Sequence, residues 1–258
     1  MGSSTISLIS VACIFGGALL GMALRTLMPQ HHLKDESRDT IKVGSGMIAT
    51  LAALVLGLLV GSAKGSFDST NTLMTQAAAK ILLLDSVLAN YGPEAKPPRE
   101  QLRQATAAGI EIFWPTEKGV ASGLSAFEKA NAMEKMRAQI RQLAPATDAQ
   151  RQLLAEAQSA TGELLQMRWL LIEQAQGSLP PLLIIILLFW LTMLHLSFGL
   201  LAPRNTTAVI VLLISAISLS GAIFLILEMN HPLSGFVRVP AAPMLKALQI
   251  LKMQGLDH

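Results

Sequence analysis

The sequence predicts an all-α polytopic membrane protein, with four transmembrane helices in two hairpins and an extramembrane helical bundle inserted between the hairpins. Four apolar segments are each long enough to cross a bilayer, which takes about 20 helical residues. Only 14% of the 258 residues are charged, whereas soluble domains carry about 25% charged residues. Between the second and third apolar segments lies a polar stretch whose apolar residues recur at helical spacing.

The predicted spans cover residues 5–27, 43–63, 180–202 and 207–228. The first span has no positively charged region before it, and its apolar core is longer than that of a signal peptide. We therefore expect a retained span, with a cleaved signal as the alternative. Residues 1–63 then form the first hairpin, and residues 179–229 form the second.

The insert at residues 64–178 holds twelve basic and twelve acidic residues, which is typical of a solvated bundle. Its first helix continues out of the second span and carries two sets of residues at seven-residue spacing, as in a coiled-coil seam. The first set is Phe67, Met74, Ile81 and Leu88, and the second set is Thr70, Ala77, Leu84 and Tyr91.

Three further helices complete the predicted bundle. The Pro-Pro pair at 97–98 opens the second helix at its first turn, and this helix runs to Trp114. The third helix covers residues 119–143. The fourth begins at a capping box at residues 147–150 and continues to the end of the insert. We therefore expect about four antiparallel helices.

Residues 230–258 are predicted to leave the membrane through a polar turn. The residues of this exit motif are Glu228, Asn230, His231, Pro232, Ser234 and Gly235. Proline has no amide hydrogen and cannot continue a helix, while glycine permits a positive φ. A carboxylate near a helix C-terminus is unfavourable. We therefore expect Glu228 to have a cationic partner, such as Arg204, Arg238 or a lysine of the bundle.

The end of the chain is predicted to form an amphipathic helix. Met244, Leu245, Leu248 and Leu251 share one of its faces. Such a helix either lies at the membrane interface or packs on the bundle, and both placements fit the pattern.

Small residues recur every four positions in two of the spans. In the second span they are Ala49, Ala53, Gly57 and Gly61, and in the first they are Gly17 and Gly21. Stripes of small residues let two helix backbones approach closely. For the second span we favour packing within the chain, and the alternative is an oligomer seam or the wall of a pore.

No catalytic motif of the HExxH, CxxC, GxxxxGK or GxSxG type occurs in the sequence, so neither an enzyme nor a cofactor is expected. Cys13 is the single cysteine and has no partner for a disulfide or a metal site. His31 and His32 are adjacent and point in different directions, so they do not predict a metal site. The net charge of +3 comes from scattered basic residues, which argues against a nucleic-acid partner.

His195 lies in the body of the third span. An ionisable group inside a membrane is costly and is a functional hypothesis by default. Because no other ionisable residue of the spans is an evident relay partner, we favour a neutral imidazole that bonds to a neighbouring helix or faces the interface near Ser197.

Five segments resemble the bacterial bestrophin-like membrane-domain family. They are DTIKVGSGMIATLAALVLGLLVGSAKGSFD (39–68), LLDSVLANYGPEA (83–95), RWLLIEQ (168–174), SFGLLAPRN (197–205) and ILEMNHPLSG (226–235). The exit motif of the family reads close to Glu-Leu-Asp-Arg-Pro-Phe-Ser-Gly. This chain matches it at Glu228, Pro232, Ser234 and Gly235. At Asn230 and His231 a neutral amide and a weak base replace the acid–base pair of the family, and Leu233 also departs from the motif. His195 stands where the resemblance leads us to expect a large apolar residue.

The resemblance implies an oligomeric channel for anions, because bestrophins are anion channels with helical cytosolic regions. It also implies a bacterial inner membrane location, with the bundle and both termini in the cytoplasm. The basic residues do not decide this orientation, since five lie near the membrane on each side. The implied partners are the lipid bilayer, copies of the same chain and small ions. The alternative is a membrane-anchored helical scaffold or signalling protein that does not conduct ions.

Overall fold

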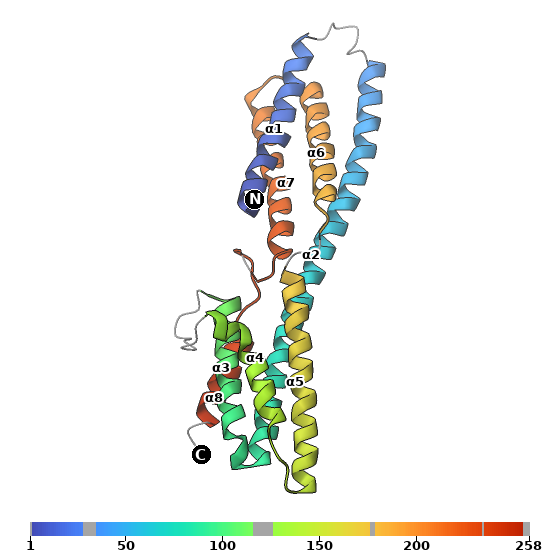
Figure 1. Cartoon of the computed structure of the whole chain (residues 1–258). Coiled ribbons are helices and arrows are strands. Elements are labelled where there is room, and N and C mark those ends of the chain that lie inside the picture. Colours follow the sequence, from blue (N-terminus) through green and yellow to red (C-terminus); the bar gives the residue numbers. More distant parts are fainter. Residues whose placement is uncertain (1, 28–34, 116–125, 176–178, 234, 255–258) are drawn as a thin grey trace. The chain divides into compact units, whose positions relative to one another are not determined.

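The computed structural model describes residues 2–27, 35–115, 126–175, 179–233 and 235–254, and within these ranges it contains helices and no strand (Figure 1). The elements are α1 (Ser3–Leu27), α2 (Asp35–Tyr91), the short 3₁₀ helix η2 (Pro93–Ala95), α3 (Lys96–Phe113), α4 (Ala126–Arg141), α5 (Asp148–Ala175), α6 (Pro181–Leu201), α7 (Thr206–Met229) and α8 (Ala242–Gln254). Four helices, namely α1, α2, α6 and α7, are long and apolar enough to cross a membrane. The predicted fold class is confirmed.

The chain divides into two compact units. The first, which we call the membrane unit, comprises Met1–Phe67 and Gly177–Arg238. The second, the bundle unit, comprises Asp68–Gln176 and Val239–His258. Helix α2 contributes its first part to the membrane unit and the rest to the bundle unit. The sequence suggests residues 230–258 as one region. The boundary between the two units falls inside this region, between Arg238 and Val239.

Within the membrane unit, α1 and α6 run in the same direction and touch through glycines. A Cβ atom on Gly17 would lie 2.8 Å from the backbone oxygen of Thr192, and a Cβ on Gly21 would collide with the backbone of Leu196. Gly199 of α6 is pressed in the same way against the backbone of Ala18. The predicted stripe in the first span therefore serves contact between two helices of one chain, as small residues do in membranes.

Polar groups at the ends of α1 and α6 tie these helices together. Arg25, in the last turn of α1, donates to the carbonyl oxygen of Ala202 at the end of α6. Arg204 donates in return to the carbonyl oxygen of Met22 at 3.3 Å. The last carbonyls of a helix have no partner within the helix, so Arg25 satisfies an acceptor at the end of α6 that would otherwise be open. Arg204 adds a second bond to a carbonyl of α1.

In the bundle unit, α2 and α5 are antiparallel. Thr70 donates to Gln174 at 2.9 Å, Lys80 forms an ion pair with Glu163 at 2.7 Å, and Gln150 donates to the carbonyl oxygen of Tyr91 at 3.1 Å. Residues later in α2 thus contact residues earlier in α5, and these three contacts fix the register of the two helices. All the predicted seam residues are buried except Phe67, which is half-buried and belongs to the membrane unit.

Helices α3, α4 and α8 complete the bundle unit. Small side chains let α3 and α4 pack closely, because Ala105, Ala108 and Ala132 form one buried cluster. The apolar face of α8 is also buried. Of the two placements that its sequence allows, the membrane interface and the bundle, this helix takes the second and packs on α3. Trp114 is buried and donates its indole N–H to the carbonyl oxygen of Val239 at 2.9 Å, so it holds the segment that leads to α8.

The close contact between α1 and α6 can be tested with two alanine variants. We expect Gly21→Ala to destabilise the membrane unit by about 1–3 kcal/mol, because the added methyl group must displace backbone atoms in a packed interface. Gly16→Ala is the matched control, since a Cβ there meets no atom within 4 Å. Unfolding midpoints in a dodecyl sulfate titration would compare the two. Equal midpoints would show that α1 and α6 do not pack through Gly21.

Candidate functional site

The small-residue stripe of the second span lies on an exposed face of α2. Ala53, Gly57 and Gly61 are exposed, and Ala49 is half-buried. A Cβ placed on Gly57 or Gly61 would meet no atom within 4 Å. Ala53, Gly57 and Gly61 are therefore open to another copy or to lipid, unlike the glycines of α1, whereas Ala49 packs against the core of the membrane unit.

A different face of α2 supplies the core of the membrane unit. Ala52, Leu59 and Ala63 are buried there, in a cluster with residues of α1, α6 and α7. In the apolar stretch of α2 only 17% of the residues are buried, compared with 33% in α1 and 28% in α6 and in α7. Helix α2 is thus the least covered span and has the most surface available to lipid, to another copy or to a pore.

Large aliphatic side chains occupy the exposed surface beside the stripe. They are Val43, Met47, Leu51, Leu54 and Leu58, all at least 49% exposed. The apolar stretch of α2 therefore presents two surfaces of different texture, one smooth and one of protruding side chains. Neither carries an ionised group between residues 43 and 63.

The exit turn is organised by a buried carboxylate. Glu228, in the last turn of α7, is 4% exposed. Its Oε2 atom accepts the backbone N–H of Phe236 at 2.5 Å and that of Val237 at 3.3 Å. Backbone donors therefore satisfy the carboxylate that the sequence led us to pair with a cation. Of the cations suggested for it, Arg204 donates instead to Met22.

The other residues of the exit motif shape the backbone around this carboxylate. Gly235 has a φ of +88°, which favours glycine, and a Cβ on it would collide with Oε2 of Glu228. Pro232 is buried, and Asn230 caps α7 by donating its backbone N–H to the carbonyl oxygen of Ile226 at 3.0 Å. His231 donates its backbone N–H to the carbonyl oxygen of Glu228 at 3.2 Å. Ser234 lies outside the described residues. The motif is thus a turn closed around an acid.

His195 is buried between two membrane helices. Its Nδ1 atom lies 3.0 Å from the carbonyl oxygen of Leu191, and its Nε2 atom lies 3.0 Å from the hydroxyl oxygen of Ser215 on α7. Phe198 packs edge-on against the imidazole, with ring centroids 6.0 Å apart. Both ring nitrogens thus have polar neighbours, and the side chain connects α6 to α7.

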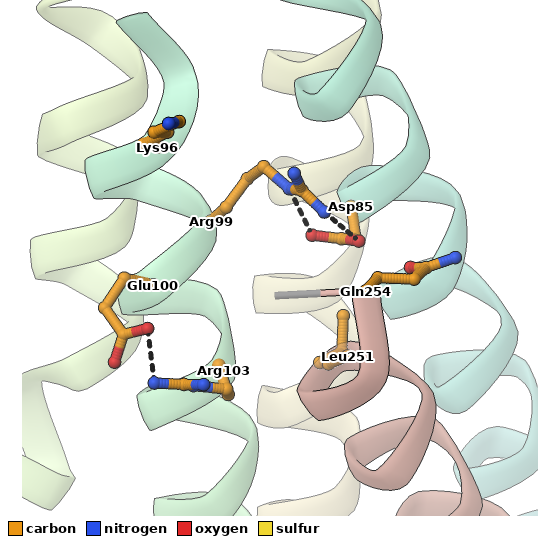
Figure 2. Close-up of a pocket in the computed structure, with 7 residues that line it drawn as sticks. All are labelled: Asp85, Lys96, Arg99, Glu100, Arg103, Leu251 and Gln254. Atoms are coloured by element: carbon orange, nitrogen blue, oxygen red, sulfur yellow. Dashed lines mark hydrogen bonds and ion pairs between the residues drawn. The ribbon is translucent and has the colours of Figure 1, made fainter. Parts of the chain in front are cut away.

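One polar pair of the bundle unit was missed by the sequence reasoning. Asp85 of α2 is buried and accepts two hydrogen bonds from Arg99 of α3, at 2.8 Å from Nε and 3.0 Å from Nη2 (Figure 2). These bonds raise the pKa of Arg99 above its ordinary value. The sequence did contain a signal for this pair. Asp85 is the single acid in the apolar run ILLLDSVLAN, and a buried acid needs a partner.

A hollow of about 200 Å³ adjoins this pair, and α8 contributes Leu251 and Gln254 to its wall (Figure 2). Arg103, also on the wall, forms an ion pair with Glu100 at 2.6 Å. Both acids that line the hollow are therefore paired with arginines of α3. The pair between Asp85 and Arg99 joins two helices and clamps α2 to α3.

No group of three or more His, Cys, Asp or Glu side chains suited to a metal occurs among the described residues. The His31–His32 pair lies outside them. Cys13 is exposed on α1.

The family model and the solved structures point to the same family. The model of the family described as Bestrophin-like domain matches residues 12–244. A crystal structure of a single-residue mutant of a bacterial bestrophin homologue from Klebsiella pneumoniae has a TM-score of 0.69 at 13% identity, covering 100% of this chain and 98% of that chain. A second mutant of the Klebsiella homologue gives 0.68 at 14% identity, with 97% of each chain covered. No curated protein matches the sequence.

The carboxylate of the exit turn can be tested by substitution. We expect Glu228→Gln to destabilise the membrane unit by about 1–2 kcal/mol, because an amide oxygen is a weaker acceptor for the two backbone N–H groups than a carboxylate. Glu173→Gln is the control, since Glu173 is exposed. Dodecyl sulfate unfolding midpoints would measure the difference. An unchanged midpoint for Glu228→Gln would mean that the turn does not depend on the charge.

The clamp between α2 and α3 gives a second test. We expect Asp85→Asn to destabilise the bundle unit by roughly 3 kcal/mol, because Arg99 would keep its charge in a largely buried place without a counter-charge. The matched control is Asp148→Asn, which breaks an exposed pair with Arg151 and should change stability by less than about 1 kcal/mol. Thermal unfolding followed by circular dichroism measures both. Similar losses for the two variants would contradict the assignment.

Proposed function

Because the chain belongs to the bestrophin-like family, we propose that it forms a homo-oligomeric ion channel in a bacterial cell membrane. The family and the four apolar helices make it a membrane protein related to bestrophins. The conduction of ions and the assembly of copies are the steps that the proposal adds. The observation that carries them is the uncovered stripe of α2.

The stripe suits the wall of a pore that is formed by several copies. Residues 53, 57 and 61 have small side chains, so α2 helices from neighbouring copies can surround a narrow opening without filling it. The adjacent aliphatic face, with Leu51, Leu54 and Leu58, would then contact the next copy or lipid. An apolar wall is compatible with conduction, because hydrophobic constrictions gate pores by losing and regaining water.

Anions are the proposed permeant ions. The resemblance to bestrophins is the first support, since those proteins conduct anions. The second is the position of Lys64, which is exposed at the end of the apolar stretch of α2. A ring of copies would repeat this lysine around one mouth of the pore, and rings of basic side chains select anions.

The proposed orientation follows from the number of spans and from the resemblance. Four spans return the chain to the side on which it began, so the amino terminus, the bundle unit and the tail share one side of the membrane. Bestrophins have helical cytosolic regions, and we therefore assign this side to the cytoplasm.

The channel can be tested in proteoliposomes, using the single cysteine of the chain. After Cys13→Ser, we introduce Gly57→Cys, which has open space for a side chain. We expect the protein to pass chloride, and a charged methanethiosulfonate reagent to lower the flux through Gly57→Cys because its adduct would stand in the pore. Ile214→Cys, on an exposed face of α7, is the control and should conduct as before after treatment.

Two results would reject parts of this proposal. Flux no greater than that of empty vesicles under any gradient would reject the channel and favour the membrane-anchored scaffold. Flux that is insensitive to modification at position 57 but sensitive at position 58 would place the aliphatic face of α2 in the pore instead of the stripe.

A further inference from the structure

The bundle unit contains a second cavity, of about 130 Å³, distinct from the hollow beside Asp85. Its wall is built by five helices, α2, α3, α4, α5 and α8. The wall includes Met74, Gly109, Ile112, Met133, Arg168 and Met244. Ile112 is 46% exposed, so the cavity reaches the surface of the unit at α3.

The lining of this cavity is almost entirely apolar. Thr106 lies in the wall, but its hydroxyl already donates to the carbonyl oxygen of Leu102 at 2.8 Å. Apart from Arg168, the wall offers few polar partners, and a buried water needs two to four hydrogen bonds. The space therefore favours hydrocarbon over water.

The size and the flexibility of the wall set the class of occupant. Engineered apolar cavities of about 150 Å³ stay dry and bind benzene, so this space accepts one small ring or a short alkyl chain. Four methionines line it, Met74, Met133, Met167 and Met244. Methionine is unbranched and polarisable and adapts to the shape of its neighbours, so the wall can close around ligands of different outlines.

Arg168 of α5 is the charged residue of the cavity lining and is half-buried. A guanidinium has five N–H donors in a planar fork and binds carboxylates in a bidentate manner. Arg168 already makes an interaction within the chain, and its five donors exceed the two that one bidentate partner takes. We propose that this cavity binds a small organic acid, with the ring or short chain of the acid among the methionines and its carboxylate on Arg168.

Full-length protein in lipid nanodiscs is the sample for the test, since detergent would compete for an apolar site. Benzoate is the probe, and toluene has the same outline without the charge. We expect benzoate to bind more tightly than toluene by about tenfold, because a hydrogen-bonded ion pair adds to the burial of the ring. Saturation-transfer NMR and calorimetric titration would measure both.

A cavity-filling variant with a matched control locates the binding site. A Cβ on Gly109 meets no atom within 4 Å, and Gly109 lines the cavity, so the side chain of Gly109→Leu should occupy the space. Gly162→Leu makes the same change at an exposed position of α5, also free of atoms within 4 Å and away from the cavity. We expect Gly109→Leu to weaken both probes at least about tenfold, and Gly162→Leu to bind them as the unaltered protein does.

Arg168→Gln tests the contribution of the charged group to binding separately from that of the apolar wall. We expect it to weaken benzoate by about tenfold while toluene binds unchanged, which also shows that the cavity is intact. The proposal is overturned if benzoate does not bind, if Gly109→Leu leaves its binding unaltered, or if Arg168→Gln affects neither probe. Because the readout is binding and not ion flux, the result is independent of whether the protein conducts.

Discussion

Both compact units of this protein depend on one unbroken helix. Helix α2 runs from Asp35 to Tyr91 and contributes buried residues to each unit. In the membrane unit it supplies Ala52, Leu59 and Ala63, and in the bundle unit it supplies the seven-residue seam. A helix satisfies its own backbone hydrogen bonds along its length, which is required in lipid and also permitted in water. One element can therefore pass from one solvent to the other, provided that its side chains change with the surroundings.

The interactions that stabilise the interior of each unit differ, because one unit is surrounded by lipid and the other by water. Lipid is as apolar as a leucine side chain, so helices gain little there from burying large aliphatic residues. The membrane unit accordingly uses glycine contacts between α1 and α6, the bond of Arg25 to a helix-end carbonyl, and the contact of His195 with Ser215. The bundle unit faces water, where burial of apolar area is favourable, and it uses the seam of α2, the alanine cluster and ion pairs such as Asp85–Arg99.

Buried acids in this chain act as points of attachment. Glu228 accepts backbone N–H groups of the exit turn, and Asp85 accepts the guanidinium of Arg99. In each case two donors converge on one carboxylate, which offsets the loss of hydration. Residues 230 and 231 depart from the family motif, but this arrangement does not need their side chains, because the donors to Glu228 are the backbone N–H groups of Phe236 and Val237.

The sequence by itself determined the class of the fold, the four spans and the helices of the insert. These features follow from composition and from the spacing of apolar residues, which are local properties. It also identified Glu228 and Gly235 as parts of one turn, because proline and glycine restrict the backbone in known ways. The heptad spacing predicted the buried face of α2 in the bundle for the same reason.

Tertiary structure alone decided which of two similar stripes is covered. A Cβ added to Gly17 or Gly21 would press on the backbone of α6, whereas one added to Gly57 or Gly61 would meet no atom within 4 Å, although both pairs have the same four-residue spacing. Spacing shows that a helix has a smooth face, but the packing partner depends on which helices the loops bring together. The sequence did not reveal the donors to Glu228 for a related reason, since backbone N–H groups carry no signature in a sequence. The cavity beside Arg168 likewise exists only because five helices meet around it.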